Sequence, residues 1–275
     1  GTGGYFGGLG LLQFRGNFGN VNNLRRSDHY DVSMGGLGDA TKMVYFTPRF
    51  AGFQFGASLT PDTGTIGRGG LSGIASTNSP AAFTADSDND GDINNLLALG
   101  ANYVGKFGDV GVTVAGTYKS SGETDGAVAA GTTNVKNNDF EVWNVGAKVD
   151  FAGFTVAAGY QENNETQLST AATALGADSG YTWNVGVGYK TGPWGVSAGY
   201  HYGERDLGSL VAGGPSLGDA DIGIIALGAQ YAVAPGWTAM AELGLYNVDN
   251  GNTAPGVAAA ANDQQVFMIT NQFVF

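Results

Sequence analysis

Large apolar side chains alternate strictly with polar or very small ones along many short segments of this chain. The clearest segment is 181–190, where one parity is aromatic or aliphatic and the other is polar or glycine. The apolar parity consists of Tyr181, Trp183, Val185, Val187 and Tyr189, and the other of Thr182, Asn184, Gly186, Gly188 and Lys190. The same alternation begins at Phe53, Leu97, Val110, Trp143, Phe154, Trp194, Ile225 and Trp237. A period of two residues predicts β-strands with one apolar and one polar face.

The order of side chains along the apolar parity separates a membrane sheet from a soluble one. Tyr181 and Tyr189 stand at the two ends of their strand, with aliphatic residues between them. Trp194 and Tyr202 bracket Val196 in the same way. A soluble core would place its aromatic residues in the middle, whereas a lipid-facing strand carries them at the two membrane interfaces. The pattern therefore predicts an all-β protein, a transmembrane antiparallel β-barrel.

The connections between the predicted strands alternate between short and long. Short turns fall near Pro48–Gly52, Phe107–Asp109, Phe151–Gly153, Thr191–Pro193 and Ala234–Gly236. Long polar segments fall near 61–94, 120–139, 161–180, 204–220 and 248–263. Outer-membrane barrels have short turns on the periplasmic side and long loops on the extracellular side, so this alternation also favours a barrel.

Eleven strands follow from these boundaries, each of roughly the 9–12 residues that a tilted strand needs to cross a bilayer. They are 41–48, 52–60, 95–106, 109–119, 140–150, 153–161, 181–190, 193–203, 222–233, 236–247 and 264–275. The first and the last both run towards the short-turn side. A single-chain bacterial barrel normally has an even number of strands. We therefore expect a further strand ahead of residue 41, either within 1–40 or absent from this sequence.

Composition removes several other classes of protein. The 24 acidic and 12 basic residues sum to a formal charge of −12, which has the wrong sign for binding nucleic acid. Cysteine is absent, which excludes disulfides and thiolate metal sites. No apolar run approaches the ~20 residues of a membrane helix. The chain starts at Gly1 without a signal peptide, so we expect either a removed leader or a start inside a longer protein.

Four segments carry a resemblance to a known family: Thr41–Asp62, Val149–Phe154, Tyr189–Trp194 and Val266–Phe275. They resemble parts of the general diffusion porins of alphaproteobacteria, which are Gram-negative outer-membrane proteins. The last segment ends in phenylalanine and looks like the terminal strand that the barrel assembly machinery reads, although Asn271 interrupts its apolar parity. The resemblance covers about 41–275, and 1–40 matches only loosely.

This resemblance implies a sixteen-stranded barrel that forms a homotrimer in the outer membrane, surrounded by lipid and lipopolysaccharide. On that plan the eleven strands are the sixth to the sixteenth, and 1–40 is the long third loop that folds into the pore. The domains are then a pore-constricting loop region at 1–40 and the transmembrane strands with their extracellular loops at 41–275. Both termini of the barrel would lie on the periplasmic side.

Candidate pore-lining residues fall into two groups. Four charged residues stand close together within 1–40, namely Arg25, Arg26, Asp28 and Asp31. Six others lie on the polar parity of the predicted strands, namely Lys42, Lys119, Lys148, Lys190, His201 and Glu242. Charges around a water-filled constriction decide which solutes pass, so we expect these residues to filter solutes. The alternative for the first group is a solvated extracellular loop.

An acidic run between two predicted strands has the beginning of a calcium-binding loop. The run contains Asp86, Asp88, Asp90 and Asp92. Gly91 supplies the bend that such a loop needs, but Leu97 stands where a bidentate glutamate is expected. Calcium binding is therefore one hypothesis and a solvated acidic loop is the other. No cofactor is required for the predicted function.

The sequence predicts an outer-membrane porin, a water-filled channel for passive diffusion of small hydrophilic solutes and ions, and not an enzyme. No acid–histidine–serine constellation in the sequence is convincing. One alternative is a substrate-specific outer-membrane channel. Another is a twelve-stranded barrel with an adhesive or enzymatic role, in which 11–18 supplies the missing strand. The net charge of −12 predicts weak cation selectivity, which inward lysines would oppose.

Overall fold

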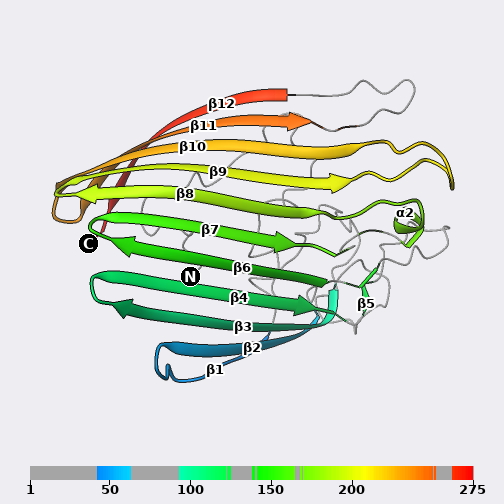
Figure 1. The fold of residues 1–275 in the computed structure, drawn as a ribbon, viewed down its shortest axis with the longest axis horizontal. Coiled ribbons are helices and arrows are strands. Elements are labelled where there is room, and N and C mark those ends of the chain that lie inside the picture. The colour runs from blue at the N-terminus through cyan, green and yellow to red at the C-terminus, as the bar shows by residue number, and fades with distance from the viewer. Residues whose placement is uncertain are drawn as a thin grey trace, which may run out of the picture.

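The computed structural model describes residues 42–62, 93–121, 123–124, 138–139, 141–164, 168, 170–249, 251 and 262–274. These residues form one antiparallel sheet whose long strands follow one another in chain order (Figure 1). Its ladder consists of β1 (Met43–Phe46), β2 (Phe53–Asp62), β3 (Ile93–Phe107), β4 (Val110–Ser120), β6 (Glu141–Phe151), β7 (Phe154–Glu162), β8 (Tyr181–Thr191), β9 (Trp194–Asp206), β10 (Asp219–Ala234), β11 (Trp237–Asp249) and β12 (Asn262–Phe273). A two-residue strand, β5 (Glu123–Thr124), pairs with β3, and a short helix, α2 (Thr170–Ala174), lies between β7 and β8. No helix in this part of the chain is long and apolar enough to cross a membrane.

The prediction of an all-β antiparallel sheet with eleven strands in its ladder is confirmed, although β1 has four residues rather than the eight predicted at 41–48, and the differences lie at the strand ends. β10 begins at Asp219 rather than at 222, and β9 continues to Asp206 rather than ending at 203. These extra residues lie beside the long connections, where polar side chains occur on both parities and the alternation is lost. β5 and α2 have no counterpart in the sequence-based prediction, and the region 1–40 lies outside the described residues.

All neighbouring strands of the ladder pair antiparallel, as expected for a chain of hairpins. The register is continuous along most pairs and shifts once, between Ala232 and Ala234 at the β10–β11 turn. Within the described residues β1 pairs with β2 and β12 pairs with β11, and these two end strands do not pair with each other. The count of sixteen strands therefore stays a prediction.

Two of the short turns share the sequence Phe-Ala-Gly-Phe and the same backbone conformation. Ala51 and Gly52 have φ values of 48° and 88°. Ala152 and Gly153 have nearly identical values of 48° and 84°. Positive φ at both central residues is the mark of a type I′ turn, whose twist suits a two-residue hairpin. A Cβ on Gly153 would lie 2.6 Å from the carbonyl oxygen of Lys190, so this turn needs glycine for space as well as for conformation.

One face of the sheet, which we call the outer face, is the parity that contains Trp183 and Val185. Its aliphatic side chains are well exposed, with Val185 at 42% and Val196 at 51%. Contacting aromatic pairs gather at both ends of this face: Trp143–Tyr160 and Trp183–Tyr200 near the long connections, and Phe154–Tyr189 and Trp194–Tyr231 near the short turns. Exposed aliphatic residues between two aromatic girdles are the arrangement of a lipid-facing surface.

Candidate pore wall

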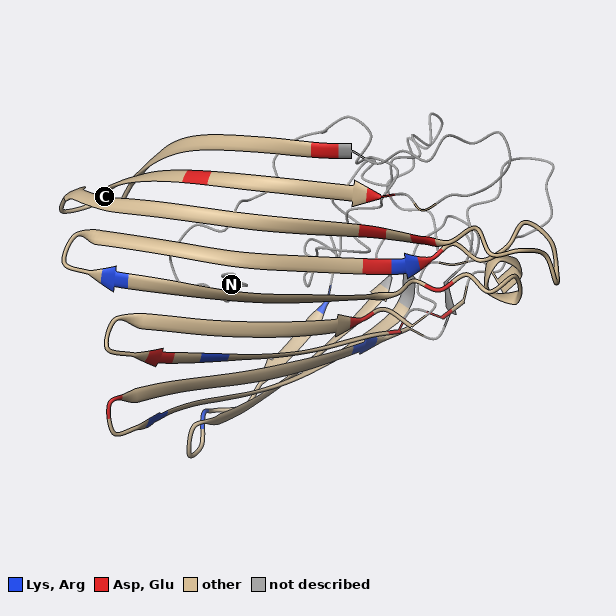
Figure 2. Ribbon diagram, turned by 45° about the horizontal axis from the view of Figure 1, so that its top comes forward, with Lys and Arg blue, Asp and Glu red and all other residues tan. Residues whose placement is uncertain are grey.

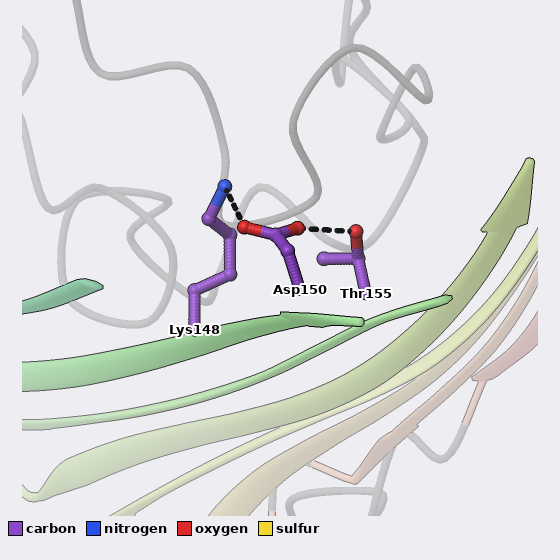
Figure 3. A network of polar contacts seen from close by, with 3 residues as sticks. All are labelled: Lys148, Asp150 and Thr155. Carbon is purple, nitrogen blue, oxygen red and sulfur yellow. Dashed lines mark hydrogen bonds and ion pairs between the residues drawn. The ribbon is translucent and has the colours of Figure 1, made fainter. Parts of the chain in front are cut away.

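The opposite parity, which we call the inner face, carries polar and very small side chains. Figure 3 shows that Lys148, Asp150 and Thr155 stand on the concave side of the curved sheet. On β8 the inner-face positions are Thr182, Asn184, Gly186, Gly188 and Lys190, and their partners on β7 and β9 are polar or small. Small side chains fill little of the space enclosed by the curve. This face is therefore suited to lining a wide passage rather than a packed barrel core.

Lys148 and Asp150 form an ion pair near the short-turn end of β6 (Figure 3). Lys148 Nζ lies 2.9 Å from Asp150 Oδ2, and the hydroxyl of Thr155 donates a hydrogen bond of 2.6 Å to Asp150 Oδ1. Thr155 lies directly opposite Asp150 in the β6–β7 register, which explains the contact. The side chains of the ion pair are 28% and 42% exposed, so both charges remain close to water.

Arg49 comes from the turn between β1 and β2, yet its guanidinium lies against the inner face. Its Nη2 donates to Gln54 Oε1 at 3.1 Å and to Asn102 Oδ1 at 2.7 Å, and its Nη1 donates to the Gly52 carbonyl at 2.6 Å. Gln54 and Asn102 are opposite each other on the inner face of β2 and β3. All three acceptors are neutral, so they hold the guanidinium in place without cancelling its charge.

Lys106 and Lys190 complete a group of four cations at the short-turn end of the inner face. Lys106 is the last inner-face residue of β3, and Lys190 is the last of β8. Both side chains are exposed. We call Arg49, Lys106, Lys148 and Lys190 the cationic arc. Figure 2 shows both basic and acidic segments beside the short turns, and a concentration of acidic segments with a few basic ones towards the long connections.

The half of the inner face next to the long connections is buried and rich in amides. Asn144, Gln161 and Thr182 are each less than a tenth exposed. The Asn144 amide donates to Thr117 Oγ1 at 2.7 Å, and the Gln161 amide donates to Asn163 Oδ1 at 2.7 Å. Each of these two amides thus has a polar partner, which offsets the desolvation penalty of burial, whereas Asn184 Oδ1 on the same face is buried without a hydrogen-bond partner among the described residues.

An apolar cluster occupies the inner face of β10 and β11, where the sequence analysis expected a polar wall. Its buried members are Ala220, Ile222, Ile224, Tyr246 and Val248, with Leu207 and Val266 packed against them. Ile222 is 0% exposed and lies opposite Val248 in the register. The sequence signal for this cluster is that Ile224 and Ile225 place isoleucine on both parities of one strand. This part of the wall is tightly packed rather than wetted.

Carboxylates mark the long-connection end of the outer face. They are Glu141, Glu162, Glu204, Asp206, Asp219, Asp221, Asp249 and Asp263, and we call them the acidic rim. Tyrosines of the adjacent aromatic girdle bind some of them. The Tyr118 hydroxyl donates to Glu141 at 3.1 Å and the Tyr202 hydroxyl donates to Glu204 at 2.6 Å. The rim thus stands on the membrane side of the sheet, just beyond the girdle.

The register places most of the predicted wall residues on the inner face. Lys119, Lys148, Lys190, His201 and Glu242 occupy inner-face positions, and Lys42 directly precedes β1. The other predicted site residues lie outside the described part of the chain: Arg25, Arg26, Asp28 and Asp31, and the acidic run Asp86, Asp88, Asp90 and Asp92. The role of all these residues in a pore or in calcium binding stays a prediction. Among the described residues, no group of three or more histidines and carboxylates is arranged to hold a metal ion.

Three inner-face cations were not singled out from the sequence. Arg49 lies in a turn, where a residue has no parity. Lys106 and Arg205 lie near strand ends, and Arg205 falls beyond the predicted end of its strand at 203. For Lys106 the signal was present, because it shares the parity of Asn102 on the same strand.

The chain is similar in sequence to known proteins. The family model described as Gram-negative porin matches residues 1–251. Uncharacterized proteins of Rickettsia conorii and Rickettsia prowazekii are 22% and 23% identical to the chain over 229 and 231 residues, or 74% of it. These matches cover 49% and 50% of the two proteins, so the chain spans about half the length of the curated relatives it matches.

Several solved outer-membrane protein structures are similar to this chain at low sequence identity. The anion-selective porin of Comamonas acidovorans is 13% identical with a TM-score of 0.50, and the match covers 86% of this chain and 59% of that one. OmpT of the Vibrio cholerae outer membrane is 17% identical with a TM-score of 0.46, covering 94% and 74%. OccAB4 of Acinetobacter baumannii is 13% identical with a TM-score of 0.47, covering 84% and 52%. At these identities the likeness concerns the fold alone.

Proposed function

The chain belongs to the Gram-negative porin family, and from that premise we propose that it forms part of the wall of a water-filled channel in the outer membrane. The proposal rests on one observation: apolar side chains are exposed and polar side chains are buried, which is the reverse of a soluble protein. Val185 on the outer face is 42% exposed, whereas the polar Gln161 and Thr182 on the inner face are buried. Hydrocarbon outside and a polar interior inside explain both facts at once.

The channel performs no covalent chemistry in this proposal. Solutes cross by diffusion through water held along the inner face, and the charges and width of that passage select them. Small, hydrophilic solutes are the expected substrates, because large apolar ones would leave the polar wall unsatisfied. Lys190 on the inner face of β8 is exposed and can contact this water, whereas Gly186 and Gly188 on the same strand are buried.

The complete channel is proposed to be a sixteen-stranded barrel that assembles as a homotrimer, as in the alphaproteobacterial general porins that the sequence resembles. The short turns would face the periplasm and the long connections the exterior, following the usual orientation of such barrels. Val274 bonds through its backbone to Gly236 of the β10–β11 turn, so the end of β12 lies on the short-turn side (Figure 1). Lipid and lipopolysaccharide would surround the outer face, and the barrel assembly machinery would insert it.

Planar-bilayer recording on the full-length protein tests the proposal. We expect stepwise conductance increments that rise with salt concentration, and liposome swelling in small sugars that declines as the sugar grows. Folding is checked independently by the heat-dependent mobility of the barrel in gel electrophoresis. A correctly folded, membrane-inserted protein that gives neither conductance nor swelling would refute the channel.

A further inference from the structure

We propose that this channel prefers small anionic solutes, because its wall presents the cationic arc to the water while its carboxylates stand mainly on the membrane side. This inference rests on the proposed channel function and adds the charge class of the solute. It opposes the expectation from net charge alone, which is −12 and predicts a cation preference.

The register places every strand cation on the inner face. Among strand residues whose side chains the structure describes, the cations are Lys106, Lys119, Lys148, Lys190 and Arg205. The aromatic ring contact between Tyr103 and Phe107 on the outer face confirms the parity at the end of β3, since Lys106 alternates with both. The turn residue Arg49 joins them through its bonds to Gln54 and Asn102.

Most strand carboxylates, in contrast to the strand cations, lie on the outer face. Of the strand carboxylates with described side chains, the eight of the acidic rim are on the outer face, and Asp150 and Glu242 are on the inner face. Asp150 is engaged by Lys148 at 2.9 Å. Glu242 is only 9% exposed. Because Lys148 and Asp150 neutralise each other, four inner-face strand cations (Lys106, Lys119, Lys190 and Arg205) stand against the buried Glu242 among these described residues.

The cations of the arc are spread along the short-turn end of the inner face. Lys106, Gly111 and Asp150 lie on one continuous row across β3, β4 and β6, and the row continues to Thr155 and Gly188. Strands are ~4.8 Å apart, so this row of five strands spans about 20 Å. Lys190 is the next inner-face residue after Gly188. Lys106 and Lys190 therefore stand about 20 Å apart, roughly twice the Debye length of ~8–10 Å at physiological salt, so each acts on the passage as a separate charge.

Position matters more than net charge in such a wall. A charge that borders the aqueous passage acts on a solute through water and a low-dielectric wall, which focuses its field into the passage. The acidic rim lies on the other side of the sheet and is screened by the solution around it. Among the described residues Lys106 and Lys190 have no carboxylate within ion-pair distance, so their charge is available to a passing anion.

The test is the reversal potential of the full-length protein in a planar bilayer with a gradient of dilute KCl. We expect chloride to be more permeant than potassium, and inorganic phosphate to carry current as well. The double variant Lys106→Gln, Lys190→Gln should lower the chloride-to-potassium permeability ratio by about two-fold or more, and the matching change to glutamate should lower it further. In ~1 M KCl, where the Debye length is about 3 Å, the preference should shrink.

The double variant Glu162→Gln, Glu204→Gln is the matched control, because it removes two charges from the acidic rim and keeps an acceptor for the hydroxyls of Tyr160 and Tyr202, which donate to Glu162 and Glu204. Its reversal potential should equal that of the unmodified channel. Potassium preference in the unmodified channel, or an equal shift in the rim variant, would overturn the inference while leaving the channel in place. A folded protein without any conductance would refute the channel function itself.

Discussion

Val185 and Ile222 are both aliphatic residues of long strands in the same sheet, yet they lie in opposite environments. Val185 on the outer face of β8 is 42% exposed, whereas Ile222 on the inner face of β10 is 0% exposed. The outer face gains stability from apolar side chains without burying them in protein, which is possible only against hydrocarbon. On the inner face each side chain must be hydrogen-bonded, packed against other side chains or in contact with water. The same residue type therefore lies in a different environment on each face, lipid outside and protein inside.

The largest expected effect tests the assignment of the two faces at adjacent positions of β8. Replacing Val185 by Arg places a charge in the lipid-facing band and should lower the free energy of unfolding by about 2–4 kcal/mol. Asn184→Arg should be far less destabilising because this side chain lies on the polar inner face rather than against hydrocarbon. Urea unfolding of the full-length protein in lipid vesicles measures both changes.

Conductance provides a second measurement for this pair. Asn184→Arg adds a charge to the inner face and should alter single-channel conductance, whereas any folded fraction of Val185→Arg should conduct as the unmodified channel does. Equal destabilisation by the two substitutions would show that the faces are wrongly assigned.

A smaller effect tests whether the apolar cluster is packed as tightly as a protein core. Ile222→Val removes one buried methylene and should lower the free energy of unfolding by about 0.5–1.5 kcal/mol. Ile225→Val on the outer face is the matched control, since that side chain is 44% exposed and lipid can fill the space it leaves. We expect the control to change the unfolding free energy by less than about 0.5 kcal/mol. Denaturant unfolding measures the change in unfolding free energy for both variants. Equal changes for Ile222→Val and Ile225→Val would mean that the cluster is not a packed core.

The smallest expected effect concerns the ion pair of the cationic arc. Thr155→Val removes the hydroxyl that donates to Asp150, and should lower the free energy of unfolding by less than about 1 kcal/mol because the pair is partly exposed. The same variant loosens Asp150 and should change the reversal potential only slightly, since no charge is removed. A decrease of several kcal/mol in the free energy of unfolding would show that this contact is required to hold the wall together.

Much of the sheet could be predicted from the sequence because its determinants are local. Alternation with a period of two requires only neighbouring residues, and the Phe-Ala-Gly-Phe turns need positive φ at two adjacent positions. The strand ends beside the long connections were less predictable. β10 starts at Asp219 because its pairing with Asp206 of β9 continues beyond the apolar band, where no hydrophobic pattern reports it.

The wall was only partly predictable for a related reason. Parity indicated the inner-face positions of Lys148 and Lys190, but not that Lys148 would be paired with Asp150 while Lys190 remains exposed. Arg49 could not be assigned at all, since its place depends on Gln54 and on Asn102, which is 53 residues away in sequence. Contacts between residues far apart in sequence require the register of several strands at once.

The sequence by itself determined the class of fold, the number of long strands and which side of each strand faces lipid, because alternation and interfacial aromatics act within single strands and hairpins. Only the tertiary structure decided how charge is divided between the two faces and which inner-face residues are buried. Those properties arise where rows of side chains from several strands meet. A net charge of −12 describes the whole chain, but a solute would meet only the charges that the register turns inward.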